Sequence, residues 1–358
     1  MDTSMPTKIF TPNLSPNRGG MPDDAERASM ISPQGRLDLG SLLRLLDWQT
    51  AMFAGRQLPK GVSPITVNVE GGYVKASLEL DNDYAINFVI TRSGGSSLEV
   101  QADILSSPQT GPTTYVTSFF FSYVTIDQDG RPVKQAPDLA PGSEQEKRLY
   151  EESMDRKKAS LTRRDAYRQA SRSPIPVEIL ENQVTSESTR HPLLNSAPQC
   201  DFNPYGIIFG GQIMKNMFDH GWNATRVALE RLTGKYLPLP LVAAVNHVTF
   251  DMPVRPGDPL HYDAAAVFSS EHSLVERVVL STSDLQLGES KQTNSALFTF
   301  TPVDTEGRRI DLVKAILPSR ECDALAHEEA VRNRKRHKAT EGRMPALHDT
   351  TLRLLQYR

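Results

Sequence analysis

The feature of this sequence that most constrains its fold is a repeat of its first half within its second half. When Gly40 is aligned with Gly211, the segment Ser32-Pro-Gln-Gly35 falls on Asn203-Pro-Tyr-Gly206, so that both the proline and the glycine match. The turns that close the two halves also correspond after a short insertion: Asp127-Gln-Asp-Gly-Arg131 and Asp304-Thr-Glu-Gly-Arg308. An internal repeat of this length predicts two copies of one domain, and a chain of 358 residues is long enough for two separate cores.

Each half reads as one helix followed by strands. Apolar residues at helical spacing predict a buried helix over 41–58, and a second, longer one begins at Gly210-Gly211 and ends before Gly234. Alternating segments predict strands over 65–69, 73–80, 85–90, 98–102 and 115–124, and over 241–250, 260–267, 273–282 and 294–301. This order indicates an α+β fold in which an antiparallel sheet wraps a single central helix.

Composition excludes several classes of protein. The net charge of −3 argues against a polyanion-binding protein, and two cysteines exclude a disulfide framework and fit a reducing compartment. No apolar run approaches 18 residues, so we expect no membrane-spanning helix. The first 30 residues resemble neither a secretory signal nor an Arg-rich transit peptide and are predicted to form a flexible arm.

The stretch Asn203-Pro-Tyr-Gly-Ile-Ile-Phe-Gly-Gly-Gln-Ile-Met214 resembles the loop and central helix of hotdog-fold acyl-CoA thioesterases. It is most similar to the mitochondrial type, which carries two hotdog units in one chain. The segments Ala136-Pro-Asp-Leu-Ala-Pro141 and Glu146-Lys-Arg-Leu-Tyr-Glu151 add a similarity to the linker of that subfamily. The resemblance covers residues 28–340 and implies a tandem hotdog, in which two sheets, each wrapped round a helix, are joined by a charged helical linker.

The resemblance and the repeat together predict the domain boundaries. The expected parts are a flexible arm (1–27), a first hotdog domain (28–135), a linker (136–185), a second hotdog domain (186–318) and a basic helix or tail (319–358). We interpret the charged stretch from Glu144 as a solvated linker helix with i,i+4 ion pairs. RNA or the phosphates of CoA are alternative partners for this stretch and for the basic cluster 332–338.

In the resembling family each site is composite, with an Asn from the loop of one unit and an Asp from the helix of its partner. The match assigns Asn203 and Asp47 to one complete site. Their counterparts in the repeat are Ser32 and Phe218, so the other site has lost both polar groups. This pattern indicates a duplicated enzyme with one working and one degenerate site.

The chemistry of thioester hydrolysis suits these residue types. Asp47 is expected to be the general base that activates water, its pKa raised by burial. Asn203 positions the water or the carbonyl, and the backbone N–H groups of Gly210 and Gly211 stabilise the oxyanion. The sequence offers no nucleophile constellation and no cofactor or metal motif, and its histidines are expected to be structural.

We therefore predict an acyl-CoA thioesterase that uses Asp-activated water and no cofactor. By resemblance, acyl-CoA is the substrate, three double-hotdog chains form the oligomer, and the compartment is mitochondrial, with the cytoplasm as the alternative. Nucleic acid is not an expected partner. The rival function is a catalytically inactive hotdog subunit, structural or RNA-associated, within a larger complex. A hotdog dehydratase is disfavoured because its catalytic His has no counterpart in either loop.

Overall fold

The computed structural model describes residues 7–10, 30–32, 35–76, 78–134, 139–197, 202–203, 205–234, 239–283, 290–340, 347 and 351. The chain divides into two compact units. Unit 1 comprises Met1–Ser160 and Arg343–Arg358, and unit 2 comprises Leu161–Gly342. No helix in the described ranges is long and apolar enough to cross a membrane.

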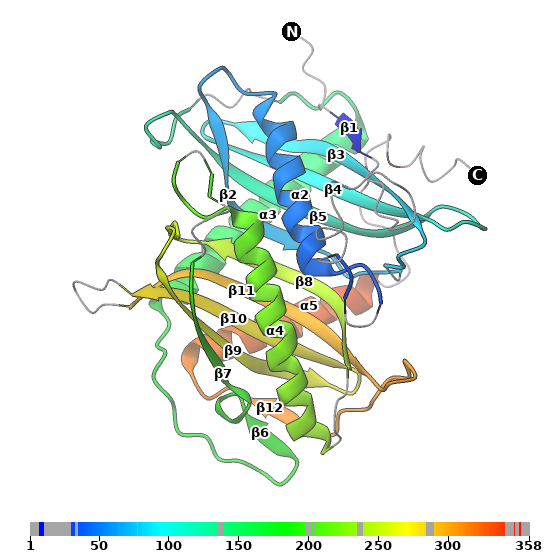
Figure 1. Cartoon of the computed structure of the whole chain (residues 1–358), viewed down its shortest axis with the longest axis vertical. Coiled ribbons are helices and arrows are strands. Elements are labelled where there is room, and N and C mark those ends of the chain that lie inside the picture. Colours follow the sequence, from blue (N-terminus) through cyan, green and yellow to red (C-terminus); the bar gives the residue numbers. More distant parts are fainter. Residues whose placement is uncertain are drawn as a thin grey trace. The chain divides into compact units, whose positions relative to one another are not determined.

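Unit 1 is an antiparallel sheet with a helix across one face (Figure 1). The helix is α2 (Leu39–Gly55), and its strands run in the order β1 (Thr7–Phe10), β3 (Asp83–Gly94), β4 (Ser97–Ser107), β5 (Thr114–Ile126) and β2 (Ser63–Gly71). The long helix α3 (Glu144–Gln169) begins in this unit and ends in unit 2.

Neighbouring residues of β3 show how both faces of this sheet are covered. The ring of Phe88 lies 6.0 Å from that of Phe53 on α2. Val89, which points to the other face, packs against Leu149 of α3. Both faces of a strand are therefore apolar here, and the buried core extends to each side of the sheet.

Unit 2 has a related architecture. Helix α4 (Gly210–Thr233) packs on a sheet with the strand order β8 (Leu239–Phe250), β11 (Ser290–Val303), β10 (Ser273–Ser283), β9 (Pro259–Ser270) and β7 (His191–Ser196) (Figure 1). Helix α5 (Glu321–Thr340) also packs on this sheet. The short strands β6 (Gln183–Thr185) and β12 (Ala315–Leu317) pair in parallel, and the 3-10 turn η1 (Glu187–Thr189) follows β6.

The core of unit 2 alternates in the same way. Ala266 and Leu274 pack with residues of α4 such as Leu229. Their neighbours Val267 and Val275 pack instead with Ala326 and Ala330 of α5. The period of two along each strand therefore separates an α4 face from an α5 face.

The predicted α+β class and both predicted central helices are confirmed. The strand predicted over 73–80 is wrong, because its described residues make only isolated bridges. After Gly71 the chain stays beside the first residues of β5, where Lys75 N donates to Val116 O at 2.8 Å, but further along Leu78 O accepts from Leu37 N at 2.9 Å. The basic cluster 332–338 forms part of α5.

The interpretation of the charged stretch as a solvated helix is also wrong for its unit 1 half. Arg156 of α3 pairs with Glu99 of β4 at 2.7 Å, and the exposed fractions of the two side chains are 16% and 1%. The Arg156 guanidinium also lies 3.8 Å from the ring centroid of Phe120. Burial alone raises the pKa of Glu99, but the charge and hydrogen bonds of Arg156 outweigh burial and hold that pKa below its ordinary value. The buried carboxylate of Glu99 on β4 therefore depends on α3 for its compensating charge.

Removal of the cation should leave a buried, uncompensated carboxylate. We expect Arg156→Met to lower the free energy of unfolding by about 3 kcal/mol, at the low end for a broken buried pair because the guanidinium is partly exposed. Arg148→Met removes an exposed i,i+4 pair with Glu152 on the same helix and should cost under about 1 kcal/mol. Urea unfolding curves measure both changes, and equal losses would contradict the structural role given to Arg156.

Gly221 lies where α4 approaches its sheet most closely. A Cβ atom there would lie 2.9 Å from Val278 Cγ2 and 3.3 Å from Phe298 Cδ2. We expect Gly221→Ala to destabilise the protein by about 1–3 kcal/mol through overpacking. At Gly55, the last residue of α2, a Cβ would meet Pro64 Cδ at an ordinary 3.7 Å. Gly55→Ala should therefore be neutral or slightly stabilising in the same urea experiment.

Candidate active site

The loop before the central helix has the same geometry in both units. We call residues 30–38 and 202–209 the pre-helix loops. Each turn has two backbone hydrogen bonds, which run from Ser32 N to Arg36 O and Gly35 N to Ser32 O in unit 1, and from Asn203 N to Ile207 O and Gly206 N to Asn203 O in unit 2. The φ angles of Gly35 and Gly206 are 68° and 69°, a left-handed conformation that favours glycine. Pro33, Gln34 and Pro204 of the aligned motif lie outside the described residues.

The side chain of Asn203 is partly committed to its own turn. Its Oδ1 accepts hydrogen bonds from the backbone N–H groups of Tyr205 at 2.9 Å and Ile207 at 3.4 Å. This is the asparagine-specific turn that a side-chain carbonyl can stabilise. The amide NH₂ is therefore the end of Asn203 that can donate to a bound molecule.

The two central helices differ at their N-termini. Helix α2 is capped by Asp38, whose carboxylate accepts a hydrogen bond from Ser41 N at 2.7 Å. Helix α4 begins at Gly210 after Phe209, which makes no side-chain capping bond. The first N–H groups of a helix have no partner within the helix and form the positive end of its dipole. The N-terminus of α4 thus has the chemistry of an oxyanion site, whereas that of α2 already holds a carboxylate.

Asp47 is a fully buried acid in the middle of α2. Its Oδ1 accepts a hydrogen bond of 2.7 Å from the hydroxyl of Thr66 on β2. On the same face of α2, the hydroxyl of Thr50 lies 2.6 Å from that of Tyr123 on β5, and both residues are fully buried. Thr50, Thr66 and Tyr123 were not among the residues predicted from the sequence. The one signal in the sequence was the i,i+3 spacing of Asp47 and Thr50, which places them on one helix face.

The equivalent region of unit 2 is aromatic. Phe218, the counterpart of Asp47, packs its ring 5.5 Å from Phe298 in an edge-to-face arrangement and 6.0 Å from Phe300. All three side chains are buried. Apolar packing thus occupies the position of the acid in this repeat.

The predicted site residues are distributed over both units. Asp47 lies in unit 1, whereas Asn203, Gly210 and Gly211 lie in unit 2. Their assembly into one site is therefore still a prediction.

Three histidines of unit 2 have polar partners within that unit. His220 Nε2 lies 3.0 Å from His191 O, and His247 Nδ1 lies 3.0 Å from Glu329 Oε1. His261 Nε2 lies 2.9 Å from Ser283 Oγ. These contacts fit the structural roles that the sequence suggested.

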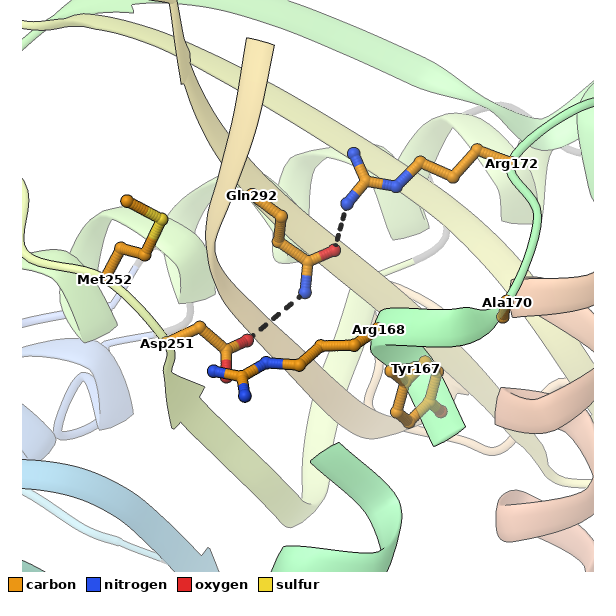
Figure 2. Close-up of a pocket in the computed structure, with 7 residues that line it drawn as sticks. All are labelled: Tyr167, Arg168, Ala170, Arg172, Asp251, Met252 and Gln292. Carbon is orange, nitrogen blue, oxygen red and sulfur yellow. Dashed lines mark hydrogen bonds and ion pairs between the residues drawn. The ribbon is translucent and has the colours of Figure 1, made fainter. Parts of the chain in front are cut away.

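A cleft of about 350 Å³ in unit 2 contains none of the predicted site residues (Figure 2). Its polar side chains pair with one another: Arg168 lies 3.3 Å from Asp251, and Arg172 donates to Gln292 at 2.5 Å. Gln292 in turn donates to Asp251 at 3.5 Å. Because these groups satisfy one another, we assign the cleft no catalytic role.

Among the described residues, one group of side chains is close enough to hold a metal ion: Glu271, His272 and Asp311. All three are at least partly exposed, and their ligand atoms lie within 4.8 Å of one another. Exposed acidic groups of this kind are common without a metal, so the group carries no assignment.

Comparison with known proteins gives this architecture a family context. No protein-family model matches the chain. The chain is 24% identical over 264 residues to acyl-coenzyme A thioesterase 2, chloroplastic, from Humulus lupulus, an alignment that covers 66% of this chain and 59% of that protein. It is also 24% identical over 339 residues to acyl-coenzyme A thioesterase 4, mitochondrial, from the same plant, covering 84% and 62%. The chain thus spans about six tenths of the length of these curated relatives.

A solved structure extends the similarity to the fold. The protein provisionally named oleoyl thioesterase from Lactobacillus plantarum superposes with a TM-score of 0.50 at 10% identity, covering 85% of this chain and 98% of that one. At this identity the likeness concerns the fold alone. The resemblance to acyl-CoA thioesterases predicted from the sequence is confirmed, and the fold is that of hotdog thioesterases.

Proposed function

We propose that this chain is a tandem hotdog acyl-CoA thioesterase that hydrolyses acyl-CoA to a free fatty acid and CoA. Its site combines Asp47 of unit 1 with Asn203, Gly210 and Gly211 of unit 2, and α3 is the linker. The observation that carries the proposal is the complementary asymmetry of the repeats. One unit keeps a buried acid, and the other keeps an asparagine loop before an uncapped helix.

The proposed reaction follows from these groups. Asp47 removes a proton from a water molecule as the water oxygen attacks the thioester carbonyl. The negative charge that develops on the carbonyl oxygen is stabilised by the N–H groups at the start of α4 and by the amide of Asn203. Collapse of the tetrahedral intermediate breaks the C–S bond, and the thiolate of CoA leaves and takes up a proton.

The rival function, an inactive RNA-associated subunit, loses support from the ion pairs of its basic stretches. Arg163 pairs with Glu329 at 3.3 Å, and both side chains are largely buried. An arginine that is buried against a carboxylate of the same unit is a poor phosphate ligand. The rival predicts RNA binding that weakens about 10³-fold or more between roughly 50 and 200 mM salt.

Release of free thiol from a panel of acyl-CoA chain lengths by the purified chain tests the proposal directly. We expect turnover of at least one chain length and no salt-sensitive RNA binding. Absence of thiol release across the panel would overturn the proposed activity. We also propose a trimer of double hotdogs, which light scattering during size-exclusion chromatography tests by measuring the molar mass. We propose a mitochondrial compartment, which imaging of the tagged protein in cells tests.

A further inference from the structure

We propose that the hydroxyl groups of Tyr123 and Thr50 hold Asp47 in its working position, so that both are positioning residues for hydrolysis. The inference rests on the proposed function and goes beyond it, because neither residue belongs to the reacting set. It follows from the order of the hydrogen bonds, from the strand register and from a comparison of the two repeats.

The hydrogen bonds have a definite direction. The Thr50 hydroxyl oxygen lies 2.6 Å from Leu46 O and 2.6 Å from the Tyr123 hydroxyl. A backbone carbonyl can only accept, so Thr50 donates its one hydrogen to Leu46, and Tyr123 must donate to Thr50. Burial, and then the charge of Asp47, raise the pKa of Tyr123 well above its ordinary value, so this donor keeps its hydrogen.

The strand register places the same tyrosine beside the group that holds Asp47. Tyr123 on β5 is the direct cross-strand partner of Thr66 on β2, and a β-bulge follows Thr66. Bulges of this kind redirect a side chain next to active sites. Thr66 donates to Asp47 Oδ1 at 2.7 Å. Helix α2 is thus tied to the sheet at Asp47 itself and again one turn later, at Thr50.

The repeat shows which of these groups the fold requires. The alignment of Gly40 with Gly211, the alignment of the closing turns, and the shared strand register with its bulge fix the counterparts in unit 2. Asp47, Thr50, Thr66 and Tyr123 correspond to Phe218, Gly221, Val242 and Phe300. Every polar member of the unit 1 set is replaced by an apolar residue or by glycine.

Unit 2 nevertheless forms the same helix-on-sheet arrangement. The architecture therefore does not need these hydroxyls. Buried polar groups cost free energy unless they are well paired. The polar set is present in the repeat that keeps Asp47 and absent from the repeat that has lost the acid. We therefore infer that these hydroxyls position Asp47.

The test compares two buried tyrosines of unit 1. Tyr123→Phe removes the proposed positioning bond. Tyr84→Phe removes a hydroxyl that donates to Glu79 O at 2.7 Å from an equally buried residue. We expect Tyr123→Phe to lower kcat for acyl-CoA by about tenfold or more, with KM little changed, because a misplaced catalytic group costs turnover rather than binding. Tyr84→Phe should leave both constants near those of the wild type.

A second pair of variants separates positioning from packing. Thr50→Val keeps the shape of the side chain and loses the hydroxyl, whereas Thr50→Ser keeps the hydroxyl. We expect Thr50→Val to lower kcat as Tyr123→Phe does, and Thr50→Ser to keep most of the wild-type kcat. Thermal melting checks that all variants are folded. An active wild type whose kcat is equally unaffected by Tyr123→Phe and Tyr84→Phe overturns this inference alone. A wild type that releases no CoA from any acyl-CoA overturns the proposed function, and this inference with it.

Discussion

Asp47→Asn is expected to reduce kcat for acyl-CoA hydrolysis by about 10²–10⁴-fold, the usual contribution of a general base. The amide keeps the shape of the side chain and can still accept the hydrogen bond that Thr66 gives to Oδ1 at 2.7 Å. It cannot take a proton from water, so the loss should fall on turnover while the fold is retained. Thiol release, together with circular dichroism and thermal melting, measures both effects.

Asp38→Asn is the matched control for Asp47→Asn. Asp38 is the N-cap of the same helix and accepts a hydrogen bond from Ser41 N, which an asparagine can also accept. Its replacement removes a carboxylate of α2 without touching the proposed site. If Asp47→Asn turns over acyl-CoA at the wild-type rate, Asp47 has no part in the mechanism.

Asn203→Asp should lower kcat by about 10²–10³-fold, as the loss of one oxyanion donor does. The aspartate keeps an oxygen for the backbone N–H groups of Tyr205 and Ile207, so the turn persists. It loses the NH₂ donor and places a negative charge where the oxyanion develops. Kinetic constants from the thiol-release assay, with the melting temperature as a check on folding, measure the effect.

The repeat supplies the control for Asn203. Ser32 occupies the same turn in unit 1, where its hydroxyl accepts from Arg36 N at 3.2 Å, and Ser32→Ala should leave the chemistry almost unchanged. The double variant Asp47→Asn/Asn203→Asp should be little slower than the poorer single variant, because groups that act as a unit lose their effect together. Inactivation by Ser32→Ala with an active Asn203→Asp would show that the working site was assigned to the wrong pair.

The parts of the fold that the sequence predicted are those that local chemistry fixes. Gly206 predicted a turn, and this glycine has a left-handed conformation. The Gly210-Gly211 step predicted a helix start, and α4 begins there. These turn and helix-start signals need only neighbouring residues, so one sequence was enough. Asp47 was assigned instead through the resemblance to the thioesterase family, on the alignment of the two repeats.

The remaining features depend on contacts between distant segments. Thr66 and Tyr123 are ordinary strand residues until the register of β2 and β5 sets them side by side. From the sequence, Glu99 was an ordinary polar residue of a predicted strand. Nothing in the sequence indicated which arginine of α3 would pair with it. The segment 73–80 had strand-like alternation, but its hydrogen bonds go to separate parts of the unit rather than to one ladder.

The different N-termini of α2 and α4 have a consequence for how such a chain evolves. In a homodimer, one gene encodes both copies of the site, so every substitution is felt at each of them. In this chain Asp38 caps α2, whereas Phe209 gives α4 no side-chain cap, and at the aligned position of the two helices only α2 carries the buried acid. In the proposed composite site, unit 1 would have to regain the asparagine and an uncapped helix end, and unit 2 the buried acid, before either half could work alone. Each half would then depend on the other for activity. The two halves would accumulate different substitutions, but selection would keep both in the chain.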